Sequence, residues 1–286
     1  MKLSLAHTLR HYDKKNIGKD ILAGLIIMAV SIPISMGYAL IAGLPAVYGL
    51  YGSVFPILVF ALLSTSPQFI FGVDAAPAAL IGSALLTLHV EAGSEEAMAV
   101  VPVLTFFVAM WLLAFSFMKA GKLVNYISAP VMGGFITGIC STIILMQVPK
   151  ILGGTAGTGE FFELAKHIGQ TAKHVNMPSI LLGVASLVIL LVAKKLVPKF
   201  PMAVVLMVAG ACYTRVGNVR ELGIQTLSKV ETGLPQWQIP DFSAVSIREA
   251  VTVSLSVAVV IMAETLLAEN NFAQKNGYRI DDNQEI

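Results

Sequence analysis

The chain has 286 residues, of which 56% are hydrophobic and only 13% are charged, and its mean hydropathy is +0.78. Because an average soluble domain is about 25% charged, this composition excludes an ordinary soluble protein, and the net charge of +2 gives no basic field for nucleic acid. Apolar runs of about twenty residues, the length that crosses the hydrocarbon layer of a bilayer, recur along the sequence. They indicate an integral membrane protein.

The expected fold class is an all-α polytopic membrane protein, with a transmembrane domain over 20–268, a cytoplasmic N-terminal segment over 1–19 and a cytoplasmic connection over 269–286. In chain order, the apolar segments expected in the membrane are 21–42, 47–63, 69–88, 97–117, 124–147, 178–196, 200–214 and 247–268. The third is expected to be broken, as a short strand followed by a half-helix. A broken segment is tolerated at membrane depth only where protein surrounds it or where it lines a cavity.

Basic residues predict the orientation of these segments. Lys and Arg gather before the first segment, after the fourth and after the sixth, at Lys14, Lys15, Lys19, Lys119, Lys122, Lys194 and Lys195. These connections lie on one side if every segment crosses, and the positive-inside rule makes that side the cytoplasm. The N-terminus is therefore expected in the cytoplasm, and the longer connections 149–177 and 215–246 are expected outside.

The third segment contains the first candidate site, in the sequence FGVDAAPAAL. An extended run over 69–71 is expected to end at Gly72, and a helix to begin near Ala75 or Ala76 with Asp74 as its N-cap. If that helix begins inside the membrane, its free N–H groups and positive dipole end form a site for an anion. Asp74 either caps the helix and does no more, or, because a carboxylate repels an anion, takes part in coupling to a proton or cation.

Glu264 is the second candidate, deep in the last apolar segment within VVIMAETLLAEN. A charge inside a membrane segment is costly unless it is paired or hydrated, so it is treated as a functional hypothesis. No basic residue lies four positions away on the same helix. Two interpretations stay open: a coupling or site-shaping carboxylate, and a purely structural hydrogen-bonding group.

The remaining reactive side chains predict no enzyme, no cofactor and no metal. The histidines lie in loops or at segment ends without other ligands at metal-binding spacing. Cys140 and Cys212 lie in apolar stretches without a partner, so they are interpreted as small membrane-helix residues. Gly153 and Gly154 lack the Lys-Thr that would follow in a nucleotide-binding loop.

Residues 20–84 resemble the sulfate permease (SulP) family of anion transporters, which includes the animal SLC26 exchangers. The elements that carry the resemblance are SIPISMGYA around Pro33, GLPAVYGLY at 43–51, Thr65-Ser66 and the turn from Gly72 to Ala76. A second stretch, AETLLAENNFAQKNGYRIDDNQEI at 263–286, is similar to the eighth span of that family and the connection after it.

The resemblance implies a fold of fourteen segments in two inverted repeats of seven, with half-helices at segments three and ten facing each other across the substrate site. It also implies a homodimer and, in most members, a cytoplasmic STAS domain. This chain would hold the first repeat and the eighth span, without segment ten and its basic residue. The expectation is therefore a truncated product or a fragment that does not transport alone.

Carried over by position, the resemblance implies a substrate site formed by Tyr38, Asp74, Ala75 and Ala76, with Glu264 as a coupling or site-shaping residue. Tyr38 would wall the pocket, and its alternative interpretation is a core or interface tyrosine. The N–H groups of Ala75 and Ala76 would contact the anion.

Three departures from the family pattern bear on this site. Gly72 is followed by Val73 where many members have proline, and the proline is displaced to Pro77. Ile34 replaces a polar residue after the proline of the first span. Sodium-coupled bicarbonate relatives place a hydroxyl four residues after the acid of the eighth span, where this chain has Ala268, so proton symport or exchange is favoured over sodium coupling.

The function implied is secondary active transport of inorganic anions across the cytoplasmic membrane by alternating access, with sulfate as the default substrate. Bicarbonate or a C4-dicarboxylate stays open. A nucleobase permease is disfavoured by the GLPAVYGLY and GVDAA elements. A non-transporting truncated membrane scaffold is the alternative from another class. The expected partners are a small anion, the lipid bilayer and a second copy in the full-length form, with no nucleic acid.

Overall fold

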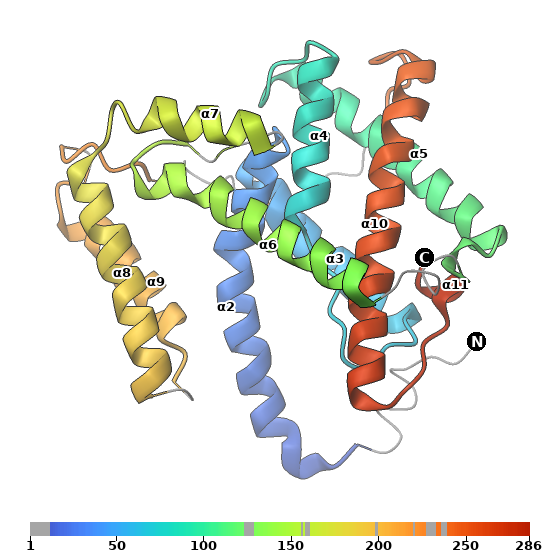
Figure 1. Cartoon of the computed structure of the whole chain (residues 1–286), viewed down its shortest axis with the longest axis horizontal. Helices are drawn as coiled ribbons and strands as arrows, with labels where there is room; N and C mark the ends of the chain where they lie inside the picture. Colours follow the sequence, from blue (N-terminus) through green and yellow to red (C-terminus); the bar gives the residue numbers. More distant parts are fainter. Residues whose placement is uncertain are drawn as a thin grey trace.

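The computed structural model of the chain describes residues 12–122, 129–155, 157, 161–197, 200–219, 221–226, 233–235 and 239–286 (Figure 1). After a short 3-10 turn at Lys14–Asn16, the helices are α2 (Ile17–Ile41), α3 (Ala46–Leu63), α4 (Ala75–Thr87), α5 (Glu95–Phe117), α6 (Ala129–Ile151), α7 (Phe161–Thr171), α8 (Met177–Leu196), α9 (Met202–Val216), α10 (Ile247–Asn276) and α11 (Asp282–Glu285). The described residues contain no strand, so the all-α prediction is confirmed for them.

Eight of these helices correspond to the eight predicted membrane segments. Among the described residues, five helical stretches are long and apolar enough to cross a membrane, and shorter apolar helices occur in α4, α6 and α9. The third segment has no strand: the chain from Phe69 to Val73 is irregular, and the helix begins at Ala75. A strand needs a neighbouring strand to hydrogen-bond with, and the described residues offer none.

Helix α7 was not predicted, because the sequence places it in the connection 149–177. It is amphipathic: Leu164 is fully buried, whereas Phe162 on another face is 82% exposed. Its eleven residues are too few and too polar to register as a membrane segment. The helix runs across the ends of its neighbours in Figure 1, as an interfacial helix does.

Glycines allow the backbones of α3 and α4 to approach that of α2 closely. A Cβ atom at Gly49 of α3 would lie 2.0 Å from the carbonyl oxygen of Ser35 in α2. A Cβ atom at Gly82 of α4 would lie 2.3 Å from the carbonyl oxygen of Ile41. Small residues permit backbone contact of this kind between membrane helices. They hold α3 and α4 against α2.

Helices α2, α3, α4, α5, α10 and α11, named here the inner group, contain most of the core. One cluster joins α4, α5 and α10 through residues such as Leu85, Leu104 and Ala250, of which Ala250 and Leu104 are fully buried. A second joins α5 to α10 through Val108, Val257 and Ala258. Figure 1 shows α10 and α5 passing beside α4.

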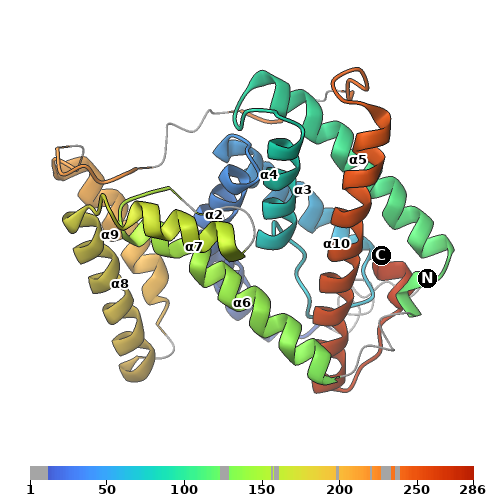
Figure 2. The same cartoon turned by 45° about the horizontal axis from the view of Figure 1, so that its top comes forward.

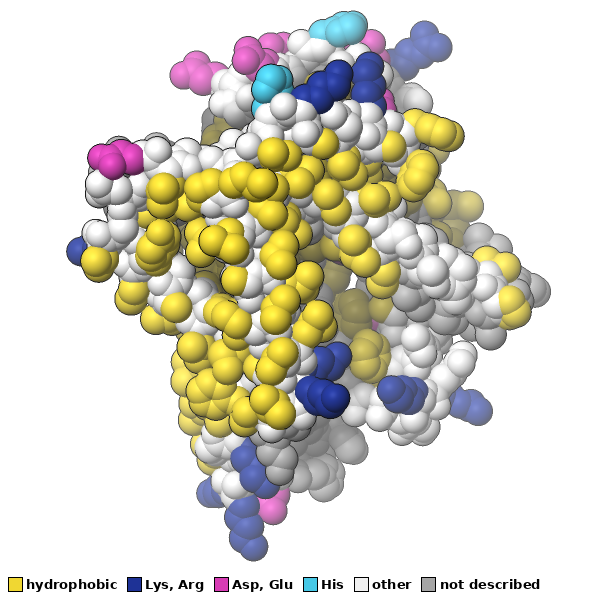
Figure 3. Space-filling model, turned by 60° about the vertical axis from the view of Figure 1, so that its left-hand side comes forward, with side chains coloured by type: hydrophobic (Ala, Val, Ile, Leu, Met, Phe, Trp, Pro, Cys, Tyr) yellow, Lys and Arg dark blue, Asp and Glu magenta, His cyan; other side chains and the backbone are white. Residues whose placement is uncertain are grey.

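Helices α6 to α9, named here the outer group, pack far more loosely. Of the described residues of α8 only Ala193 is buried, and α9 has no buried residue. Figure 2 shows α8 and α9 standing together away from α4, α5 and α10. The face on this side carries a broad field of hydrophobic side chains between charged side chains at its two ends (Figure 3). This is the distribution expected of a surface in contact with lipid.

Candidate functional site

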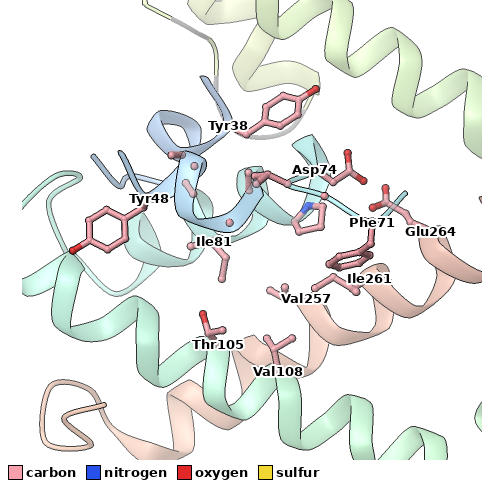
Figure 4. Close-up of a pocket in the computed structure, with 18 of the residues that line it drawn as sticks. Tyr38, Tyr48, Phe71, Asp74, Ile81, Thr105, Val108, Val257, Ile261 and Glu264 are labelled. Atoms are coloured by element: carbon pink, nitrogen blue, oxygen red, sulfur yellow. The ribbon is translucent and has the colours of Figure 1, made fainter. Parts of the chain in front are cut away.

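A cavity of about 570 Å³ lies within the inner group. It is bounded by α2, α3, α4, α5, α10 and the irregular segment that leads into α4 (Figure 4). Most of its lining is apolar, and the polar side chains on it are Tyr38, Tyr48, Asp74, Thr105, Glu264 and Thr265. No Lys, Arg or His of the described residues lines this cavity.

The N-terminus of α4 opens at this cavity. Asp74 has an extended backbone, and its side chain accepts a hydrogen bond of 2.6 Å from the N–H of Ala75, as an N-cap does. Pro77 has no N–H, and the N–H of Ala78 already donates to the Asp74 carbonyl at 3.3 Å. Among the described residues, the N–H of Ala76 is therefore the one donor of this first turn that has no acceptor in the protein.

Two carboxyl groups meet beside that helix end. Glu264 comes from α10, and Figure 4 shows its carboxyl group and that of Asp74 turned toward one another, next to Phe71 and Ile261. Both oxygens of Glu264 are buried, and no donor among the described residues hydrogen bonds to them. Asp74 is the more accessible of the two. The sequence named both residues, and the fold brings them together from positions 190 residues apart.

The other predicted site residues are divided between two cavities. Tyr38 lies on α2, is half-buried and lines the same cavity as Asp74 and Glu264. The side chains of Ala75 and Ala76 line a separate cavity of about 310 Å³ between α4 and α6. Two of the four predicted binding residues thus turn their side chains away from the main cavity. A contact from either alanine to a ligand in it would have to come from the backbone.

An aromatic wall on one side of the cavity was not predicted. The rings of Phe60 and Phe71 stack with centroids 5.4 Å apart. Phe71, Ile261 and Thr265 line both the main cavity and a smaller one of about 150 Å³, so they separate the two. The run Phe69-Ile70-Phe71 was visible in the sequence, but nothing in a single segment showed that it would face a cavity.

The described residues contain no group of three or more His, Cys, Asp or Glu side chains placed to hold a metal ion. Lys150 at the end of α6 brings its ammonium group next to α2, where a Cβ atom at Gly37 would lie 3.4 Å from it. This places one positive charge beside the helix that carries Tyr38, outside the main cavity.

Comparison with known proteins identifies the family. The family model of the sulfate permease family matches residues 17–286. The chain belongs to the sulfate permease family. Its members are transporters and not enzymes, so the absence of a catalytic set in the sequence agrees with its family.

Curated relatives come from bacteria, plants and animals. A "Probable sulfate transporter" of Mycobacterium tuberculosis is 28% identical over 278 residues, which cover 97% of this chain and 49% of the relative. Sulfate transporter 2.1 of Arabidopsis thaliana is 28% identical over 97% of this chain and 43% of its own length. The human sulfate transporter is 25% identical over 99% of this chain and 44% of its own length. The chain spans about half the length of the curated relatives it matches.

Two solved structures share the arrangement of helices. The overall structure of SLC26A9 superposes with a TM-score of 0.82 and 26% identity, over 99% of this chain and 48% of that protein. The transmembrane domain of BicA, a cyanobacterial bicarbonate transporter, superposes with a TM-score of 0.76 and 20% identity, over 96% of this chain and 69% of that domain. The likeness to BicA shows the fold alone.

Proposed function

We propose that this chain forms the anion-binding part of a secondary active transporter, in which a proton accompanies a small anion and alternating access moves both across the cell membrane. The observation that carries the proposal is the meeting of Asp74 and Glu264 beside the N-terminus of α4 in a membrane-embedded cavity (Figure 4). Sulfate is the default substrate, because the curated relatives that match most of the chain are named as sulfate transporters.

Charge balance at the cavity supports a co-transported positive charge. The positive end of the α4 dipole, where Asp74 and Pro77 line the cavity, attracts the anion. Two facing carboxylates would oppose it, and no basic side chain of the described residues lines the cavity to offset them. One proton shared between Asp74 and Glu264 removes a negative charge and replaces repulsion by a hydrogen bond. Anion binding and proton binding would therefore reinforce one another.

A proton fits this site better than sodium. Sodium prefers several oxygen ligands, and the residue one helical turn after Glu264 is Ala268, which lines the cavity without a side-chain oxygen. Tyr38 lines the cavity close to Asp74. The side chains of Ala75 and Ala76 have no role in this site, and the backbone N–H of Ala75 already donates to Asp74.

Topology, location and assembly form part of the same proposal. The basic residues at the start of α2 and the ends of α5 and α8 are placed in the cytoplasm, with the N-terminus. The start of α2 and the ends of α8 and α10 lie at the same end of the molecule in Figure 1. We further propose that the full-length protein pairs this repeat with an inverted second repeat and forms a homodimer. Cross-linking of the full-length protein in membranes would test the dimer.

The deciding experiment is uptake of labelled sulfate by the full-length protein in proteoliposomes, with and without an inward proton gradient. The gradient should stimulate uptake by the wild type. Asp74→Asn and Glu264→Gln should each lose this stimulation, because an amide binds no proton in its place. Glu249→Gln is the matched control, since Glu249 is an exposed acid on the first turn of the same helix. It should behave as the wild type does.

Each other result revises a different part of the proposal. Full gradient stimulation in both carboxyl variants would remove the two acids from the coupling step. Uptake of bicarbonate or fumarate without uptake of sulfate would keep the transporter and replace its substrate. If none of these anions were taken up, the alternative of a non-transporting membrane scaffold would be favoured.

A further inference from the structure

A second carboxyl pair, Glu269 and Glu285, lies near the C-terminal end of α10, outside the main cavity. After α10 ends at Asn276, Gly277 turns the chain with a positive φ of 72°, and α11 folds back against the ends of α3 and α5. The side chain of Gln284 donates to the Leu63 carbonyl at 2.7 Å, and that of Ser116 donates to the Asn283 carbonyl at 2.5 Å. These contacts fix α11 to the end of α3, where the segment that leads to Asp74 begins, and to the last turn of α5.

Thr65 and Glu285 form the centre of this contact. The backbone N–H of Thr65 donates to Oε1 of Glu285 at 2.5 Å, and the Thr65 hydroxyl donates to the same oxygen. The N–H of Asp281 donates in turn to the Thr65 hydroxyl at 3.1 Å. Oε1 of Glu285 is thus fully engaged, whereas its Oε2 is buried with no donor among the described residues.

Glu269 of α10 is a close neighbour of Glu285. Its side chain is 0% exposed, and no donor among the described residues hydrogen bonds to either of its oxygens. The charged groups that act on it are both acidic, Glu285 and Asp282 of α11. After the end of α5, Lys119 and Lys122 flank the contact of Gly121 with Asp282, but both side chains are exposed. Two buried carboxylates without a cation between them would repel each other strongly.

We infer that Glu269 and Glu285 form a second proton-binding site, in which one proton on Glu269 is donated to Oε2 of Glu285. The site is separate from the Asp74 and Glu264 pair, and it does not depend on their role. A proton here completes a continuous set of hydrogen bonds from Glu269 through Glu285 to Thr65. Its loss leaves two facing carboxylates, and α11 separates from the connection between α3 and α4.

The position of this site connects it to the segment that forms the cavity. Thr65 lies nine residues before Asp74, and Glu285 lines the small cavity that Phe71, Ile261 and Thr265 separate from the main one. Release of α11 would therefore free one end of the irregular segment that carries Phe71 and Asp74. The proton on Glu269 thus keeps α11 bound to the connection between α3 and α4.

Hydrogen exchange tests this site directly, because the Thr65 amide donates to Glu285. The full-length protein in nanodiscs is followed over a pH series, with exchange in peptides covering 63–70 and 279–286 corrected for the intrinsic effect of pH. In the wild type, both peptides should be protected at low pH and should lose protection as the pH rises. Glu269→Gln should keep them protected at every pH, because its amide donates to Oε2 of Glu285 without titrating. Glu285→Gln should also abolish the pH dependence, since no facing carboxylate remains.

Three comparisons make the inference falsifiable. Glu264→Gln and Glu249→Gln should follow the wild type, and loss of the pH dependence in Glu264→Gln would assign the proton to the cavity instead. Protection that does not change with pH in the wild type, or that changes equally in Glu269→Gln, would overturn the site. Protection at high pH that appears with sodium and disappears with choline would replace the proton by a metal cation.

Discussion

Helices α8 and α10 are similarly apolar, yet they are used in opposite ways. In α8, 11% of the most apolar stretch is buried within the protein, against 39% in α10. Helix α10 packs on α4, α5 and α11, whereas α8 presents residues such as Leu181 to the surroundings. In a membrane, apolar composition places a helix in lipid but does not decide which neighbours it has. Which helices pack together depends on close packing and on buried polar groups, and both are concentrated in the inner group.

Within the described part of the chain, the two groups meet where α9 lies against α2 and at one apolar cluster. Met146 of α6 and Leu164 of α7 are almost completely buried, and they pack against Ile41, Ala42 and Ala78 of the inner group. The contact is apolar and lies beside the helix that carries Tyr38. Substitutions placed in each group should therefore have separable effects.

The largest effect is expected from Gly49→Ala. The new Cβ atom would lie 2.0 Å from a backbone oxygen of α2, and neither backbone has a side-chain rotation that relieves the contact. Helices α2 and α3 must move apart, at a cost of about 3 kcal/mol or more. Gly210→Ala in α9 is the control, because its Cβ atom would meet nothing within 4 Å. It should leave the melting temperature in detergent unchanged or slightly raised. Equal losses in the two variants would contradict the division into groups.

A smaller loss is expected from Leu104→Ala in the core of the inner group. Leu104 is 0% exposed, so truncation leaves a cavity between α4, α5 and α10. The cost should be about 1–3 kcal/mol, below that in a soluble core, because lipid is itself apolar and only lost packing counts. Leu181→Ala removes the same atoms from a side chain that is 73% exposed, and it should cost less than about 0.5 kcal/mol. Reversible unfolding in mixed micelles measures both.

Asn176→Ala should destabilise the outer group locally. The Asn176 side chain caps α8 by accepting from the Ser179 N–H at 2.8 Å, and it also donates to the Leu222 carbonyl at 2.8 Å. Loss of a cap of this kind costs about 1 kcal/mol. Hydrogen exchange should increase in the first turn of α8 and near Leu222, and it should not change in α4 or α10. An increase at α4 would show that the groups are coupled more tightly than their contacts indicate.

The number and positions of the membrane helices were predictable from the sequence, and the environment of each was not. Runs of apolar residues located α2 to α6 and α8 to α10, but α4 begins at Ala75 and not at 69, and α10 continues to Asn276 and not to 268. Asp74 was correctly expected before a helix that begins at Ala75. The amphipathic helix α7 was missed, because its signal is a periodicity over eleven residues in a polar connection. The short strand expected before α4 is absent, since pairing depends on a neighbour that local sequence does not specify.

The candidate site was predictable in its charges and less so in its surroundings. An acid inside an apolar segment is visible in any sequence, and this signal led to Asp74 and Glu264. Glu269 lacks this signal and was assigned to a cytoplasmic connection, because the apolar run ends at 268 while the helix continues to Asn276. Its burial arises from α11, which returns after a glycine turn, and only the fold shows that contact.

The smallest effect is expected from removing the two cysteines. Cys140 and Cys212 are free and exposed, and both lie in the outer group. Cys212 lies on α9, none of whose residues is buried, and an exposed thiol in such a place makes no contact whose loss would be felt. The double variant Cys140→Ala with Cys212→Ser should change the free energy of unfolding by less than about 0.5 kcal/mol. Both thiols should react with a membrane-permeant maleimide in the folded protein. Slow reaction at either position, or a marked loss of sulfate uptake in the double variant, would mean that another part of the full-length protein covers this face. The loose packing of the outer group would then reflect a surface that this other part covers, and not contact with lipid.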